Sequence, residues 1–439
     1  MNMSLAPEAL IASTIARIDQ LIAAQVNAIL HHPRFQQLES AWRGVQLLVK
    51  EQRAAAKYVK IRLLDASWPE IVRDIERSLD VDQSALFARI YSNEFDMPGG
   101  EPYGVLLCHY WIDHRRPADI ATLKGLANIA AAAFCPFFFP TSPSLFGVES
   151  FHELTTTNLD QLFRHADYAG WNQLRKMEDA QFLAFILPGL LLRAPWGEHR
   201  PIIGKLRFKE QIERHQDLLW GHPGLALAQV LIREFDQVGW FAHIRGAPRD
   251  TLAGGVVTQP PTLAKQVPDA ALSHLPATEI VLTDSTEREL NSQGLIALTH
   301  CWNTPYCAFV HLPSLHASTT DGKRPENSSQ RISAQIQNIL CASRFAHYIK
   351  VMMRDKVGTF ASAVECETHL SRWLEQYAIA NDSADWSTQA RYPLRMFRVE
   401  VYEDQWRAQH YLCNIYLTPH YQIDGVVSEI KLTTELGRA

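Results

Sequence analysis

Between Tyr58 and Asn291 the chain alternates short apolar runs with helical patterns, and this alternation limits the folds it can adopt. The strand-like runs are 59–64, 104–110 and 279–282, and the helix-like runs are 68–79, 117–133 and 287–291. Short strands that alternate with helices favour a mixed or parallel sheet whose two faces are covered. We therefore expect an α/β fold, of the mixed α+β kind, for the central part of the chain.

The N-terminal segment has the spacing of one long amphipathic helix. Its apolar side chains follow one another at steps of three and four residues until Pro33, and they are Ile11, Ile15, Ile18, Ile22, Val26 and Ile29. This spacing predicts a helix of about six turns with a single apolar face. The face has two possible uses, packing on the body of the same chain or docking on a neighbouring chain.

The last fifth of the chain changes to β texture. Apolar and polar residues alternate from Phe397 to Val401 and again from Tyr411 to Leu417, which predicts a hairpin. A further alternating run from Val426 to Leu436 predicts a long terminal strand, which must pair inside its own sheet or on the edge of another chain. We expect three domains: an N-terminal helical arm with its linker (1–57), a central α/β domain (58–315), and long helices with C-terminal β-strands (316–439).

The run from Ser343 to Gly358 is rich in polar side chains and yet has the spacing of a packed helix. Phe345, Ile349 and Met352 or Met353 recur on one face, and the cations on the helix are Arg344, Lys350, Arg354 and Lys356. The pattern predicts an apolar side against a core and a basic side against a partner. His347 lies in the same run, and we expect it to belong to a scaffold helix rather than to a catalytic site.

Composition excludes several classes of protein. The net charge of −5 argues against a general nucleic-acid binder, whose domain is usually basic. Seven cysteines without a Cys-x-x-Cys pair and an opening without a basic, apolar leader indicate a reduced, cytoplasmic protein. The apolar runs 126–139 and 182–192 are each too short to span a bilayer and contain proline. We therefore expect no membrane insertion.

No motif in the chain carries a strong argument for catalysis. His300, Cys301, Cys307 and His311 are the best metal candidates, but their spacing does not match the common zinc sites. The glycines between Gly99 and Gly104 lack the pattern of a phosphate loop or a dinucleotide fingerprint. A nucleophile elbow and a His-Glu-x-x-His motif are also missing from the sequence. We expect no catalytic residues, no cofactor and no metal.

Several segments, in collinear order, resemble one family. They are Ile29–Gln36, Leu38–Gly44, Asp82–Phe87, Gly99–Gly104, Ser142–Gly147, Ala242–Gly246, Ser343–Phe360 and Arg391–Leu394. Together they are similar to the large subunit of the type VI secretion contractile sheath, the TssC/VipB family. The resemblance covers nearly the whole chain.

The resemblance implies a mechanical, non-enzymatic protein with a contractile tail-sheath-like fold. In that family the large subunit pairs with a small sheath subunit of the TssB/VipA kind, and the heterodimers stack as six-fold rings with neighbouring sheath protomers. The rings enclose a tube of Hcp-like hexamers, start from a baseplate, and contract to drive tube and spike outward. A AAA+ ATPase of the ClpV kind then recycles the contracted sheath.

The resemblance also implies roles for residues of this chain. Strand exchange between protomers would use 398–417 and 425–436, in particular Val426, Ser428, Ile430, Leu432 and Leu436. The N-terminal arm from Ala9 to Leu30, with Ile11, Ile15, Ile18 and Ile22, would be a second connector. Inner-tube contacts would come from the charged residues Asp321, Lys323, Arg324 and Glu326.

In the family the recognition helix for the ATPase lies upstream of the His31-His32-Pro33 motif, and this chain begins closer to that motif than family members usually do. Two readings follow: recycling is altered, or the arm helix performs the recognition. Two other functions remain as rivals to the type VI sheath. One is a sheath subunit of another contractile injection system or phage tail, and the other is an α/β enzyme with a pocket near His300 and His311.

Overall fold

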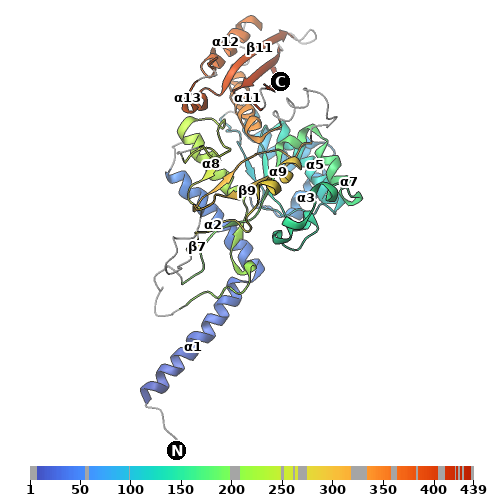
Figure 1. Ribbon diagram of the computed structural model, residues 1–439. Coiled ribbons are helices and arrows are strands. Elements are labelled where there is room, and N and C mark those ends of the chain that lie inside the picture. Colours follow the sequence, from blue (N-terminus) through green and yellow to red (C-terminus); the bar gives the residue numbers. More distant parts are fainter. Residues whose placement is uncertain are drawn as a thin grey trace, which may run out of the picture.

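The structure is a computed structural model, shown in Figure 1. It describes residues 7–54, 59–97, 99–197, 208–248, 252–260, 263–264, 274–317, 334–356, 363–381, 384–403, 411–420, 422–423, 426–427 and 430–436. The residues predicted to contact the inner tube, Asp321, Lys323, Arg324 and Glu326, lie outside these ranges, as does Ser428.

A six-stranded sheet forms the centre of the molecule. In spatial order its strands are β1 (Leu106–Leu107), β2 (Phe137–Pro140), β3 (Leu183–Leu187), β9 (Leu295–His300), β10 (Cys307–Phe309) and β6 (Val256–Val257). The first four strands are parallel, and β10 pairs antiparallel with both β9 and β6. Every residue of β2 and β3 is buried, as expected for parallel strands covered on both faces.

Helices cover this sheet on both sides. The main ones are α3 (Trp68–Arg77), α5 (Pro117–Ala132), α7 (Ala169–Arg175), α8 (Gly224–Val238) and α9 (Asp284–Ser292). In the view of Figure 1, α8 lies to one side of β9, and α3, α5 and α7 lie to the other. Large side chains such as Phe138, Phe185 and Trp171 are fully buried between these layers. The predicted α/β core is therefore confirmed.

Short elements connect the main ones. The short helices are η1 (Val81–Gln83), α4 (Ala85–Phe87), the π-helix η2 (Ala88–Asp96), η3 (Pro143–Phe146), η4 (Phe151–Thr156), α6 (Leu159–Leu162), η5 (Ala166–Tyr168), η6 (Glu178–Phe182) and η7 (His215–Asp217). Two small antiparallel pairs are β4 (Leu190–Leu191) with β5 (Trp220–Gly221) and β7 (Leu263–Ala264) with β8 (His274–Leu275).

Two long helices open the chain, α1 (Pro7–Leu30) and α2 (Pro33–Ala54). Helix α2 packs on the body through Ser40, Gly44 and Leu48, and a Cβ atom at Gly44 would lie 2.7 Å from a methyl group of Leu225. This close approach explains why glycine stands in the middle of a helix. Helix α1 projects away from the body, as Figure 1 shows.

The C-terminal part has its own core. It contains α11 (Ile336–Lys356), α12 (Ala363–Glu375), α13 (Trp386–Arg391), β11 (Leu394–Glu403), β12 (Tyr411–Pro419), β13 (Gln422–Ile423), β14 (Val426–Val427) and β15 (Ile430–Leu436). Strands β11, β12 and β15 form an antiparallel sheet, whose apolar residues Val399, Ile415 and Leu417 pack with Phe345 and Leu370 in a second hydrophobic cluster. The predicted hairpin is confirmed.

Three strand predictions differ from the structure. Residues 59–64 and 279–282 form neither strand nor helix, because in the described part of the chain no neighbouring strand pairs with them. The expected terminal strand is divided into β14, which pairs with β13, and β15, which pairs with β12. The predicted domain boundaries at 57 and 315 stay predictions.

Candidate assembly surfaces

Helix α1 exposes most of the apolar face that its sequence predicts. The exposed fractions of Ile11, Ile15, Ile18 and Ile22 are 60%, 54%, 49% and 39%. Leu10, Leu21 and Ile29 are also exposed. Side chains at alternating steps of four and three form the seam that pairs one helix with another. Within the described chain this seam is left largely without a partner.

By length and composition, one helix among the described residues could cross a membrane, and it is this one, Glu8–Leu30, whose most apolar 18-residue window contains no buried residue. Arg17 and Asp19 lie at its middle. A charge at the centre of a membrane-spanning helix costs about 2.5–3.5 kcal/mol on insertion scales. On the helical wheel Asp19 flanks the isoleucine seam and Arg17 lies further from it, and a helix that packs on the seam can leave both charges in contact with water. The sequence of α1 therefore suits a protein partner better than a bilayer.

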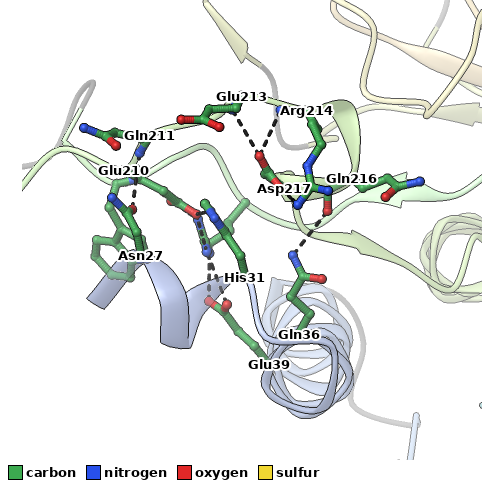
Figure 2. Close-up of polar contacts among 12 residues, drawn as sticks. Asn27, His31, Gln36, Glu39, Glu210, Gln211, Glu213, Arg214, Gln216 and Asp217 are labelled. Carbon is green, nitrogen blue, oxygen red and sulfur yellow. Dashed lines mark hydrogen bonds and ion pairs between the residues drawn. The ribbon is translucent and has the colours of Figure 1, made fainter. Parts of the chain in front are cut away.

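A buried polar cluster joins the base of α1 to the body, and Figure 2 shows four of its members, Asn27, His31, Glu39 and Glu210. Arg193 donates to Glu210 Oε2 at 2.6 Å and to Glu39 Oε1 at 2.8 Å. Nε2 of His31 lies 3.3 Å from Glu210 Oε1, and Asn27 Oδ1 accepts a hydrogen bond from the backbone of Gln211 at 3.3 Å. We call these residues, Asn27, His31, Glu39, Arg193 and Glu210, the arm anchor.

The arm anchor is held by charge in a site with little water. Glu210 and Arg193 are 0% and 4% exposed in their side chains. Burial alone would raise the pKa of Glu39, but hydrogen bonds from Arg193 and Arg43 outweigh it and hold this pKa below its usual value. Burial would likewise lower the pKa of Arg193, and its bonds to Glu210 and Glu39 raise it instead. Each charge therefore depends on its partner.

The anchor was missed in the sequence, although one signal was present. Arg193 ends the apolar run Leu190–Leu192, and a lone cation next to buried strand residues needs a buried acid. Its two acids lie 17 and 154 residues away, a separation that no local pattern reveals. His32, next to His31, points elsewhere and accepts a hydrogen bond from the backbone of Arg34.

The C-terminal strands pair within the chain. Ile430, Leu432 and Leu436 of β15 lie opposite Leu417, Ile415 and Tyr411 of β12. Val426 belongs to the short hairpin and lies opposite Ile423. The other edge of β12 pairs with β11, and among the described residues the outer edge of β11 is paired only through a single bridge between Leu394 and Ala378. The sheet therefore has an edge that a strand of another chain can extend.

The basic side of α11 contacts its own chain, contrary to the expected partner contact. The Arg344 guanidinium lies 4.3 Å from the ring centroid of Phe235. His347 bonds to the carbonyl of Ala133, and Lys350 and Arg354 contact η2. Burial lowers the pKa of His347 to about 4, so this imidazole is neutral and donates through Nε2. Periodicity finds the helix but does not say which polar face becomes desolvated.

The four candidate metal ligands do not gather around one point. Cys307 lies opposite His300 in the β9–β10 ladder, and His311 Nδ1 lies 2.8 Å from Glu287 Oε1. Burial raises the pKa of Cys307 to about 12, so this thiol is not poised to become a thiolate ligand. In the described ranges, no group of three or more histidine, cysteine or acidic side chains could hold a metal.

The segment predicted to contact the tube begins and ends at one place. The backbone N–H of Ser314 donates to the carbonyl of Ala334, and that of Ile336 donates to the carbonyl of Leu312. Arg175 holds the outgoing side through the carbonyl of Leu315. The described residues that flank 318–333 on its two sides are therefore hydrogen-bonded to each other.

Comparisons with known proteins give a consistent result. Two models of the VipB family match the chain, the EvpB/VC_A0108 tail sheath N-terminal domain over residues 12–316 and the tail sheath gpW/gp25-like domain over residues 325–436. A curated relative, the type VI secretion system sheath protein TssC1 of Pseudomonas aeruginosa, is 33% identical over 435 residues. The alignment covers 98% of this chain and 86% of the relative. These matches confirm the resemblance, and the chain belongs to the TssC/VipB family of type VI secretion contractile sheath proteins.

Proposed function

We propose that this chain pairs with a small sheath subunit, polymerises with neighbouring protomers around an inner tube, and contracts to propel tube and spike. Family membership supports a structural role in a type VI contractile sheath. The work of such a subunit is mechanical, so the proposal includes no catalytic activity. The assembly would be cytoplasmic.

One observation carries the pairing step: α1 stands away from the body with its apolar seam in solvent. Four isoleucines of this seam are each at least 39% exposed, which is costly for a helix that never meets a partner. The arm anchor fixes the base of α1 and leaves the seam free. We assign the seam to helix packing against the small sheath subunit or a neighbouring protomer.

Co-expression with the small sheath subunit tests this function. Wild-type chain should give hollow helical tubules in electron micrographs. Replacing Ile15 and Ile18 with aspartate should abolish tubules while the body keeps its fold, because the substitutions lie on the exposed seam. The control replaces Gln20 with aspartate, on another face of the same helix. Tubules that form equally with all three chains would contradict the assignment of the seam.

We also propose strand exchange between protomers at the C-terminal sheet. Asn414 and Thr433 are opposite each other in the β12–β15 ladder, so cysteines at both positions can report which chain supplies β15. If strands are exchanged, oxidation of assembled sheath should link different protomers into multimers on a denaturing gel. Exclusively intramolecular links would reject exchange at this strand.

We also propose contacts with the inner tube, the baseplate and a recycling ATPase. Inner-tube contact by Asp321, Lys323, Arg324 and Glu326, which lie outside the described residues, rests on the membership of the chain in the sheath family. Contact through exposed charges is individually weak and can break during contraction. Changing Lys323 and Arg324 to glutamate should weaken association with Hcp-like hexamers and leave the heterodimer intact. Baseplate attachment and recycling by a ClpV-like ATPase rest on family membership alone.

A further inference from the structure

Three polar side chains of α11 follow one another along the face that meets the N-terminal half of the chain. His347, Lys350 and Arg354 are spaced by three and four residues, so they share one side of the helix. His347 Nε2 donates to the carbonyl of Ala133 at 3.0 Å, just beyond the end of α5. Arg354 donates to the carbonyls of Phe95 and Met97 at the end of η2. Two helix ends, whose last carbonyls lack helical partners, are thus bonded by α11.

Between these two contacts, the Lys350 ammonium lies inside a cage of aromatic rings. Its Nζ is 5.0 Å from the ring centroid of Tyr91, 5.1 Å from that of Phe95 and 4.8 Å from that of Phe134. All three distances are within the range of cation–π attraction, about 6 Å. Tyr91 and Phe95 stand on successive turns of η2 with their centroids 4.9 Å apart, and Phe134 follows α5. The cage therefore combines two elements of the N-terminal half with one cation from the C-terminal half.

Phe134 takes an unfavourable backbone conformation to contribute its ring. Its φ of 48° lies in the left-handed region, where glycine or asparagine normally follows a helix. The ring of Phe134 packs against both hydrophobic clusters, the central one and the C-terminal one. A bulky residue held in this conformation indicates that the surrounding contacts over-determine it.

We propose that Lys350, held in the cage of Tyr91, Phe95 and Phe134, is a latch that fixes the orientation of α11 and its β-sheet relative to the central sheet. The rings attract the ammonium, which also donates to the hydroxyl oxygen of Tyr91 at 3.4 Å, and the lysine stem extends between η2 and the end of α5. Burial lowers the pKa of Lys350 to about 8, so the cation still predominates at pH 7. The latch acts within one chain, and its test is independent of sheath assembly.

Hydrogen exchange of the full chain tests the latch. Lys350→Met keeps the apolar stem and removes the charge. We expect amides of η2 to exchange about ten- to thirtyfold faster, the loss of a desolvated cation–π contact, while β3 keeps its protection. Lys350→Arg keeps a cation over the rings and should restore most of the protection. Lys124→Met is the matched control, since Lys124 lies on α5 and its ammonium donates to the side chain of Gln173.

A second variant separates charge from packing. Tyr91→Leu keeps Lys350 and removes one ring, together with the hydroxyl to which Lys350 Nζ donates at 3.4 Å, and should also speed exchange of η2. If ring and cation act together, the η2 amides of the double variant Lys350→Met with Tyr91→Leu exchange no faster than those of the faster-exchanging single variant. Wild-type exchange in Lys350→Met overturns the proposal. Equal losses of η2 protection in Lys350→Met and Lys350→Arg also overturn it, as do strictly additive effects of Lys350→Met and Tyr91→Leu, because both results indicate packing alone. If Lys350→Met does not fold, the exchange of η2 is compared in the other two variants. Fast exchange in Tyr91→Leu with most protection kept in Lys350→Arg supports the latch, and equal exchange in the two variants overturns it.

Discussion

Helices α1 and α11 have similar lengths, 24 and 21 residues, and similar amphipathic spacing, yet they meet opposite surroundings. The isoleucines of α1 stay in solvent, whereas Phe345 and Ile349 of α11 are 0% and 1% exposed. The polar residues differ as well. Apart from Asn27 in the arm anchor, most of those of α1 face water, whereas those of α11 bond to helix ends and aromatic rings of the same chain. The polar groups of α11 bond within the chain, so this helix is part of the folded body. The apolar face of α1 is left exposed, so we infer that this helix packs against another chain.

We expect the largest effect on the free energy of unfolding at the arm anchor, which joins the exposed helix α1 to the body. Arg193→Met leaves the buried carboxylate of Glu210 without its arginine, while the partly buried carboxylate of Glu39 keeps only Arg43. We expect the free energy of unfolding to fall by about 3–5 kcal/mol, measured by urea denaturation. Arg43→Met is the control, because Arg43 bonds to Glu39 from a more exposed position, and it should cost about 1 kcal/mol or less. Equal losses in the two variants would show that the anchor is not a buried charge cluster.

The same truncation on the two helices should have unequal effects. Ile349→Ala removes a buried side chain and should lower the free energy of unfolding by about 2–5 kcal/mol. Ile15→Ala removes an exposed one and should change it by less than about 0.5 kcal/mol. Thermal and urea unfolding of the free chain measure both. A loss at Ile15 close to that at Ile349 would mean that α1 packs on its own body.

A smaller, pH-dependent effect is expected where α8 approaches α11. Glu234 is fully buried, and neither carboxyl oxygen has a hydrogen-bond partner among the described residues. Burial raises its pKa from 4.5 to about 7, against the opposing charge of Arg233. The folded state keeps a proton that the unfolded state releases near 4.5, so this group's contribution to stability is present below pH 4.5 and is lost as pH rises through 7.

Glu234→Gln keeps the shape and removes this loss. We expect the variant to gain about 1–3 kcal/mol of unfolding free energy over wild type near pH 8 and much less near pH 5. Urea unfolding at a series of pH values measures the difference. A difference between variant and wild type that does not change with pH would show that Glu234 is ionised in the folded chain.

Local sequence patterns predicted the helices and strands that depend mainly on residues close together in the sequence. The period of α1, the helical pattern of 68–79 and the alternation in β11 and β12 each predict an element, and each element is present. Residues 59–64 alternate equally well, but a strand needs a second strand beside it, and none is paired with them in the described chain.

The working contacts of the molecule could not be predicted in this way. Glu39 and Arg193 are 154 residues apart, and Lys350 is 259 residues from Tyr91. Such pairs exist only after the fold brings distant elements together. The sequence of α11 shows its cations but not the rings that receive them. The family of the chain could be recognised without these contacts, because several collinear segments of the sequence resemble it.

The comparison of α1 with α11 is tested most directly by hydrogen exchange in the free chain and in the assembled sheath. We predict that amides of 8–30 exchange fast in the free chain and become strongly protected in the sheath, because the seam acquires a partner. Amides of 343–354 should be protected equally in both states. Fast exchange of 8–30 in the assembled sheath would contradict the account, since the exposed face of α1 would then have no role in assembly.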